Sequence, residues 1–167
     1  MFKLNKSYLI IIGIVLIGLF LRFYRILDFP VQLNHDEVSQ LYDAISIAQT
    51  GKDIYGNSLP TIFPSVQDYK SPFYTYITSF FYLMLGGGEL TIKLPGAIFG
   101  SLAILAVYIF VLRLFKDPKI ALVSSFLTAI APFEIFFSRK SFENVAGIFF
   151  MILGFTALLQ FTKNSRL

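Results

Sequence analysis

The hydrophobic pattern of this chain consists of five apolar stretches separated by polar segments. The apolar stretches cover residues 7–21, 73–85, 94–112, 120–137 and 145–161. A helix needs roughly 20 apolar residues to span a bilayer, whereas stretches of about 10 to 14 are more typical of buried or interfacial helices. The pattern therefore predicts an all-α integral membrane protein whose longer stretches are spans.

The first stretch is bounded by Lys6 and Arg22, and it is a little short for a span. The long side chains of these two residues can extend to the membrane surfaces and make up the missing length. No small-residue cleavage site follows, because the next residues are Arg22-Phe23-Tyr24-Arg25. We therefore predict a retained span over about 7–26 rather than a cleaved signal peptide.

The distribution of charge decides how many stretches cross the membrane. If 73–85 lies in the interface, the spans are about 7–26, 94–112, 120–137 and 145–161, and nine of the ten acids lie outside. The cytoplasmic side then holds Lys3, Lys6, Arg113, Lys116, Lys119, Lys163 and Arg166, with Asp117 as its one acid. A fifth span would reverse this asymmetry, against the positive-inside rule. We therefore predict four transmembrane helices in a multi-pass protein of the cell membrane, with a cytoplasmic N-terminus.

The long first outer loop, over 28–93, is predicted to carry juxtamembrane helices. An apolar stripe at helical spacing predicts one amphipathic helix over 37–49, formed by Val38, Leu41, Tyr42, Ile45 and Ala48. Gly51 stands where a C-terminal cap belongs, and residues 52–69 carry turn signals. Ser71-Pro72 has the pattern of a helix start and opens the interfacial helix, as Asp117-Pro118 opens the third span.

Composition excludes several classes of function. The chain is 56% hydrophobic and contains no Cys and one His, so disulfides, thiolate catalysis and zinc sites built from Cys or several His are excluded. The net charge is +4, but the basic residues form no single patch, so we expect no nucleic-acid partner.

Three polar clusters fall on the predicted outer face. They are His35-Asp36-Glu37, preceded by Arg22 and Arg25; Asp68-Tyr69-Lys70; and Ser138-Arg139-Lys140 with Glu143-Asn144. A carboxylate can deprotonate an acceptor hydroxyl while cations stabilise a departing phosphate, and at a membrane surface that phosphate would belong to a lipid. Each cluster also has a simpler reading: acids at a helix start, a solvated Lys70–Asp68 pair, basic anchors at span ends, and a loop histidine.

The order of these features resembles the N-terminal part of the GT-C glycosyltransferases that use polyprenyl-phosphate sugars, in the protein-mannosyltransferase and aminoarabinose-transferase-like branch. The matching segments are 21–26, Asn34-His35-Asp36-Glu37, 51–57, Asp68-Tyr69-Lys70-Ser71-Pro72, 93–97, Phe137-Ser138-Arg139 and Phe142-Glu143-Asn144. Ser71 departs from the family pattern, which continues Pro-Pro after the lysine. Family members are several hundred residues long, so the resemblance implies that this chain is an N-terminal fragment.

The resemblance implies an inverting transfer of a mannose-like hexose from a polyprenyl-phosphate donor to an acceptor hydroxyl on the extracytoplasmic face. It implies Asp36 as the principal catalytic acid, with Glu37 and His35 assisting. Lys70, Arg139 and Arg22 would hold the donor phosphate, and Arg139 with Glu143 would form a second polar site. The acceptor, whether protein, lipid or glycan, is left open, as is a divalent metal at the carboxylates.

Two other functions remain open from the residues. A transporter or flippase of lipid-linked sugars would favour charges inside spans and broken helices at the midplane, and this chain offers only Pro132 and Glu134 near the outer end of the third span. A non-catalytic truncated membrane subunit would keep the fold without the reaction.

Overall fold

The computed structural model describes residues 6–65 and 68–164, which form seven helices and one two-stranded hairpin. The elements are α1 (Lys6–Phe23), α2 (His35–Thr50), β1 (Phe63–Ser65), β2 (Asp68–Lys70), α3 (Pro72–Leu85), α4 (Glu89–Phe115), α5 (Pro118–Ile130), α6 (Pro132–Arg139) and α7 (Glu143–Asn164). Lys3 and Arg166, which entered the charge argument, lie outside the described residues.

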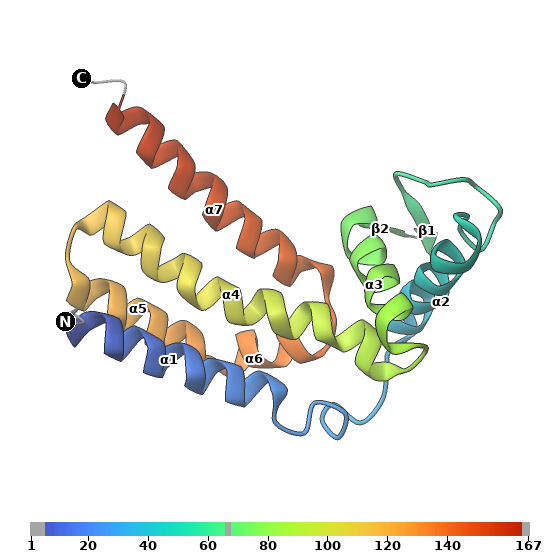
Figure 1. Ribbon diagram of the computed structural model, residues 1–167, viewed down its shortest axis with the longest axis horizontal. Helices are drawn as coiled ribbons and strands as arrows, with labels where there is room; N and C mark the ends of the chain where they lie inside the picture. Colours follow the sequence, from blue (N-terminus) through green and yellow to red (C-terminus); the bar gives the residue numbers. More distant parts are fainter. Residues whose placement is uncertain (1–5, 66–67, 165–167) are drawn as a thin grey trace.

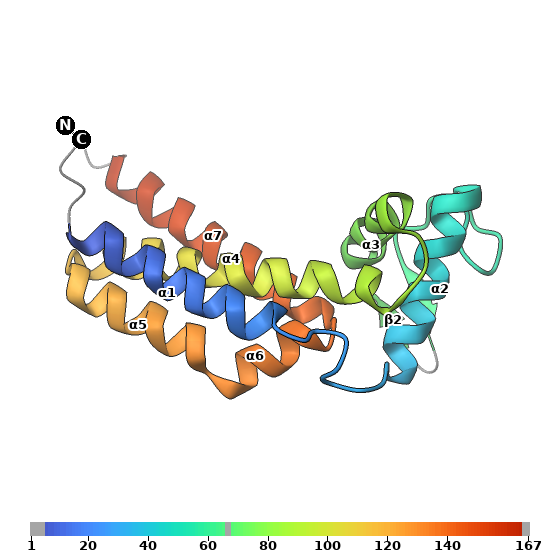
Figure 2. The same cartoon turned by 60° about the horizontal axis from the view of Figure 1, so that its bottom comes forward.

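The molecule has two parts, a bundle of long helices and a smaller head at one end of it (Figure 1). The bundle contains α1, α4, α5, α6 and α7, and the head contains α2, α3 and the hairpin. Helix α4 is the centre, because it contacts every other helix of the bundle and also α3. Figure 2 shows the head beyond the end of α1, joined to it by a single connecting segment.

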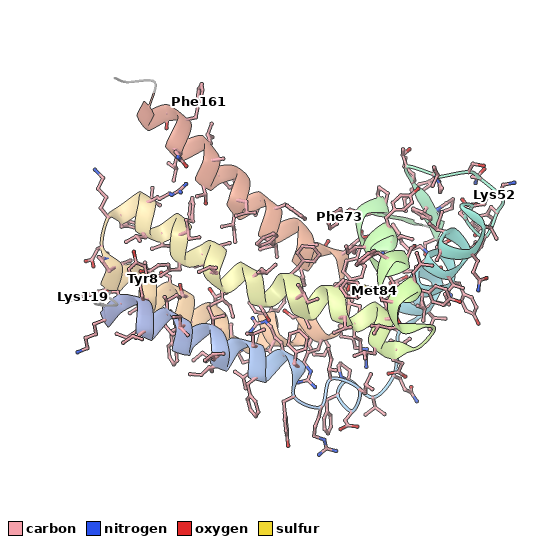
Figure 3. All side chains as sticks on the ribbon, in the orientation of Figure 1. Tyr8, Lys52, Phe73, Met84, Lys119 and Phe161 are labelled. Carbon is pink, nitrogen blue, oxygen red and sulfur yellow. The ribbon has the colours of Figure 1, made fainter. Side chains whose placement is uncertain are left out.

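Three helices, α1, α4 and α7, are long and apolar enough to cross a membrane, and the bent pair α5 and α6 would make a fourth span if it counts as one. The structure is therefore all-helical apart from the hairpin, with three or four candidate spans. Helix α3 has only 14 residues, which suits the predicted interfacial position of this segment. Tyr8 and Lys119 lie at the end of the bundle opposite Lys52 of the head (Figure 3).

The third predicted span is not one straight helix. It bends by 53° between α5 and α6, because Pro132 has no N–H to donate to the carbonyl of Thr128 and so interrupts the helical hydrogen bonds. The expectation of a single span over 120–137 is corrected to two helices that meet at Ala131. A backbone carbonyl left unpaired in this way needs another donor, especially in an apolar environment.

Arg22 supplies that donor, which corrects the expectation that it extends to the membrane surface. Its side chain is completely buried, and its guanidinium donates to the carbonyls of Thr128 at 3.2 Å and Ala129 at 3.0 Å. It also donates to Gly18 O at 3.2 Å and to Ser138 Oγ at 3.3 Å. Arg22 therefore caps the C-terminal end of α5.

Arg139 binds backbone carbonyls at the C-terminal end of α1 and in the turn that follows it. Its guanidinium donates to the carbonyls of Leu21 at 3.0 Å, Arg25 at 2.8 Å and Phe29 at 2.9 Å. Arg22 of α1 thus caps the end of α5, and Arg139 of α6 binds carbonyls at the end of α1 and in the turn after it. This exchange fixes the turn after α1, from which the chain crosses to the head.

Small residues allow this close packing. Gly96 and Gly100 lie one helical turn apart on α4, and a Cβ at Gly100 would overlap the side chain of Ser138. A Cβ at Gly96 would approach the carbonyl oxygen of Ser138 to 2.7 Å. Small residues at this spacing are typical of helix contacts in membranes, and here they hold the α6–α7 turn against α4.

The buried faces of the two head helices carry several polar side chains beside apolar ones. The buried positions of α2 include Glu37, Gln40 and Asp43, whereas Val38 and Tyr42 of the predicted apolar stripe are exposed. Leu41 of the same stripe is partly buried against the cluster of Tyr74, Ile92 and Ala146, so the stripe is divided between the protein and the exterior. The buried side chains of helix α3 are Tyr74, Thr75, Thr78 and Ser79, whereas Phe80, Leu83 and Met84 are exposed. The interior of the head therefore mixes these polar groups with apolar side chains such as Ala44, Ile47 and Phe63.

Candidate functional site

Helix α2 begins with a capping box. The Asn34 side chain accepts a hydrogen bond from Glu37 N at 2.7 Å, and Glu37 Oε2 accepts one from Asn34 N at 2.8 Å. This reciprocal pair satisfies two backbone donors at the helix start. The sequence Asn34-His35-Asp36-Glu37 thus builds the local structure itself, and its carboxylates acquire different environments.

Glu37 is the structural member of the acidic pair. Its side chain is 3% exposed and lies 3.7 Å from Lys140 Nζ. Burial raises the pKa of this carboxyl above its ordinary value of 4.5, against the opposing effects of the Asn34 backbone N–H, the charges of Lys140 and Lys93 and the Ser141 hydroxyl. The helix-start reading of the sequence is therefore confirmed for Glu37.

Asp36 and His35 are exposed at the same helix start. Asp36 makes no hydrogen bond or ion pair with any residue that the structure describes, and it lines the cavity described below. His35 does not line that cavity. A carboxylate without a structural partner, beside a cavity, is free to meet a substrate hydroxyl.

Lys70 is held by α2 in a buried ion pair. Its Nζ lies 2.7 Å from Asp43 Oδ2 and 2.7 Å from Ser39 Oγ, and the two side chains of the ion pair are 8% and 1% exposed. The partner that the sequence offered, Asp68, has a side chain outside the described part of the chain. An ammonium group has three N–H donors. The bonds to Asp43 and Ser39 use two of them, so one N–H of Lys70 is left for another acceptor.

The sequence analysis missed the role of Asp43, because it treated this residue only as one of the nine acids on the predicted outer side. A signal was present: Ser39 and Asp43 are four residues apart, hence on one face of the predicted helix, and that face is not the apolar stripe. A polar face on a helix beside a lysine-bearing loop is a reason to expect an ion pair.

Glu143 connects the bundle to the head. Its Oε2 accepts a hydrogen bond of 2.6 Å from the backbone N–H of Ser71, the residue before α3.

The predicted start of α3 at Pro72 is confirmed, but Ser71 makes no side-chain cap. The predicted caps Gly51 and Asp117 are confirmed, since Gly51 is left-handed after α2 and Asp117 accepts from Lys119 N.

These groups surround one cavity of about 220 Å³ between the head and the bundle. Three segments far apart in sequence line it: the start of α2, the hairpin and the start of α7. The lining residues are Asn34, Asp36, Glu37, Gln40, Ser65, Tyr69, Lys70, Ser141, Phe142, Glu143 and Asn144. Four predicted site residues therefore come together here: Asp36, Glu37, Lys70 and Glu143.

Three predicted site residues do not line this cavity. Arg22 is buried in the bundle, Arg139 is bound to the carbonyls after α1, and His35 faces outward. Arg139 instead borders a separate apolar groove with Phe29, Pro132 and Phe136. Lys93, which belongs to the quoted segment 93–97, is buried, and its Nζ is 3.1 Å from both Pro30 O and Glu89 Oε2. It holds the segment that leads into α2.

The described residues include no group of three or more His, Asp or Glu side chains placed to hold a metal ion. Asp36 and Glu143 line the cavity, but Glu37 Oε2 and Glu143 Oε2 are already bound to backbone N–H groups. The described carboxylates therefore offer no complete protein ligand set for a metal ion, and we derive no step through one.

Comparison with known protein families gave a match over the second part of the chain. The model of the dolichyl-phosphate-mannose-protein mannosyltransferase family matches residues 69–167, more than half of the chain. The match contains Lys70, Arg139 and Glu143, whereas Asp36 and Glu37 precede it. No curated protein and no solved structure matches the chain.

Proposed function

Because this chain belongs to the dolichyl-phosphate-mannose-protein mannosyltransferase family, which comprises membrane glycosyltransferases that use lipid-linked sugars, we propose that its cavity transfers a sugar from a polyprenyl-phosphate donor to an acceptor hydroxyl. The observation that carries the proposal is the exposed Asp36 carboxylate, which is unpaired among the described residues and shares one cavity with Lys70.

In the proposed reaction, Asp36 takes the proton of the acceptor hydroxyl. The acceptor oxygen attacks the anomeric carbon from the face opposite the phosphate, so the configuration inverts. The bond between that carbon and the phosphate oxygen breaks, and the electron pair leaves with the phosphate. Proton transfer by a positioned carboxylate and stabilisation of developing charge are the two contributions that this arrangement can supply.

Lys70 is the cation proposed to meet the phosphate. Its ion pair with Asp43 and its hydrogen bond to Ser39 hold the Nζ atom in place, and preorganised donors stabilise charge without reorganisation during the reaction. Arg22 and Arg139 act from behind the site in this proposal, because they fix the helices that carry it. The site is proposed to open to the extracytoplasmic side, with the basic end of the bundle in the cytoplasm.

The broken helix at Ala131 and the buried Arg22 are the features that a transporter would use. Here the guanidinium is bound to Thr128 O, Ala129 O, Gly18 O and Ser138 Oγ. These four contacts occupy the guanidinium at the helix break, so its charge serves the fold and not a transported substrate. This favours the glycosyltransferase over the transporter.

The test is sugar transfer from a labelled polyprenyl-phosphate mannose in membranes that contain the protein. Asp36→Asn should abolish transfer, whereas Asp28→Asn should not, because Asp28 is an exposed aspartate paired with Arg25 away from the cavity. Equal transfer by the wild type and Asp36→Asn would remove Asp36 from the chemistry. Absence of transfer by the wild type would contradict the proposed reaction.

A further inference from the structure

Most polar side chains that line the cavity are already bound to other groups of the protein. Those that form a hydrogen bond with another described residue include Asn34, Glu37, Gln40, Lys70 and Glu143. The hydroxyl oxygens of Ser65 and Ser141 are buried in the walls. These bonds hold the walls of the cavity in place, and they reduce the number of side chains that are left for a ligand.

Asp36 and Asn144 are the exceptions. Both are exposed and line the cavity, yet neither side chain forms a hydrogen bond or an ion pair with any residue that the structure describes. Asp36 lies at the start of α2 in the head, and Asn144 lies in the first turn of α7 in the bundle. Asp36 takes the acceptor proton in the proposed reaction, whereas Asn144 has no part in that chemistry.

The wall around Asn144 suits a neutral ligand. Phe142, which also lines the cavity, adds an apolar side chain, and apolar walls with a few polar groups are typical of small-molecule sites. The carboxylate of Glu143 is next in the chain and is bound to the backbone N–H of Ser71. This carboxylate would repel a phosphate, so the ammonium group of Lys70 on the hairpin is the better place for one.

The proposed reaction indicates where the sugar ring lies. In an inverting displacement, the acceptor oxygen approaches the anomeric carbon from the face opposite the leaving group. Asp36 would be at one end of this line and Lys70 at the other, and both residues belong to the head. The ring projects sideways from the line, and the remaining wall of the cavity is the start of α7. The ring is therefore directed toward Asn144.

We propose that Asn144 binds a hydroxyl group of the donor sugar ring and so contributes to the selection of the sugar. This assignment rests on the proposed function. A carboxamide oxygen accepts a hydrogen bond and the NH₂ group donates two, which matches a ring hydroxyl that both donates and accepts. The carboxamide is neutral and does not take up a proton, so its contribution is to binding and specificity.

The test compares a lipid phosphate with and without the sugar. Radiolabelled polyprenyl-phosphate mannose and polyprenyl phosphate are each bound at equilibrium to the purified protein, which requires no turnover. Asn144→Ala should weaken binding of the mannosyl lipid by about fivefold, the equivalent of one neutral hydrogen bond. Binding of the sugarless lipid should not change. Gln32→Ala is the matched control and should leave both affinities unchanged, because Gln32 is an exposed carboxamide that does not line the cavity.

Donors that lack one ring hydroxyl identify the group that Asn144 binds. The donor without that hydroxyl should bind the wild type about fivefold more weakly. It should lose nothing more in Asn144→Ala, because the same hydrogen bond is absent in both cases.

An equal loss of affinity for the mannosyl and the sugarless lipid would overturn the proposal, because it would mean that Asn144 acts on the phosphate or on the fold. Unchanged binding of the mannosyl lipid by Asn144→Ala would overturn it as well. A loss confined to the mannosyl lipid, in a protein that transfers no mannose, would support the role of Asn144 and contradict the proposed reaction.

Discussion

The ion pair between Lys70 and Asp43 offers the sharpest test of how the site is held. The two charged atoms are 2.7 Å apart, and their side chains are 8% and 1% exposed. Removal of one partner from a buried pair leaves an uncompensated charge and typically costs about 3–5 kcal/mol. Asp43→Asn keeps a neutral acceptor and leaves Ser39 in place, so we expect a loss of about 3 kcal/mol in the free energy of unfolding.

The assay is a double-mutant cycle on unfolding in detergent, with Asp43→Asn, Lys70→Met and the two combined. Lys70→Met alone leaves the Asp43 carboxylate buried without its cation, and should be similarly destabilising. The combined variant buries neither charge. Its loss should therefore be smaller than the sum of the single losses by at least about 1.5 kcal/mol, since contacting residues are not additive.

Asp53→Asn is the matched control. Asp53 is also a buried aspartate, but its carboxylate accepts from the neighbouring loop, from Tyr55 N, Asn57 N and Asn57 Nδ2. This variant combined with Lys70→Met should be additive within about 0.5 kcal/mol. Additivity of Asp43→Asn with Lys70→Met would refute the argument, because it would mean that the pair contributes no coupling.

Two further predictions follow from packing and from burial. Gly100→Ala should destabilise the bundle by about 1–3 kcal/mol, because its Cβ would overlap Ser138. Gly154→Ala on α7 meets nothing within 4 Å and should be neutral or slightly stabilising in the same unfolding assay. Equal effects of the two substitutions would contradict the close α4–α6 packing. Burial raises the pKa of Glu37 above 4.5, so its contribution to stability is fully present below pH 4.5 and is lost as pH rises through the raised pKa. Glu37→Gln, which preserves the capping box, should flatten the stability–pH curve in that window, and an unchanged curve would contradict the raised pKa.

Local sequence determined the elements of this protein. Apolar length predicted the helices that became α1, α4 and α7, and turn and cap signals at Gly51, Ser71-Pro72 and Asp117-Pro118 located helix ends. These features depend on neighbouring residues only, through backbone sterics and local hydrogen bonds. The capping box of Asn34 and Glu37 belongs to the same category.

The polar faces of the head were not predictable in this way. Periodicity identifies an apolar stripe, but it does not say which side of the helix meets the protein and which meets an apolar exterior. In α2 the stripe of Val38 and Tyr42 faces outward, and Gln40 lies beside Thr75 at 3.5 Å. Only the packing of α2 on α3 decided that Glu37, Gln40 and Asp43 lie inside together with Ala44 and Ile47.

The roles of the charged residues likewise depended on tertiary structure. The sequence predicted Asp36, Glu37, Lys70 and Glu143 as candidates for one site, and the fold brought them to one cavity, while it committed Arg22 and Arg139 to carbonyls more than 100 residues away. A charge's environment is set by what folds against it, and such contacts between distant segments leave no local signal. Apolar length and local end signals predicted the long helices and the membrane class, because both depend on neighbouring residues. The bend at Ala131 and the set of side chains left available for chemistry depended on the packing within the bundle and between head and bundle.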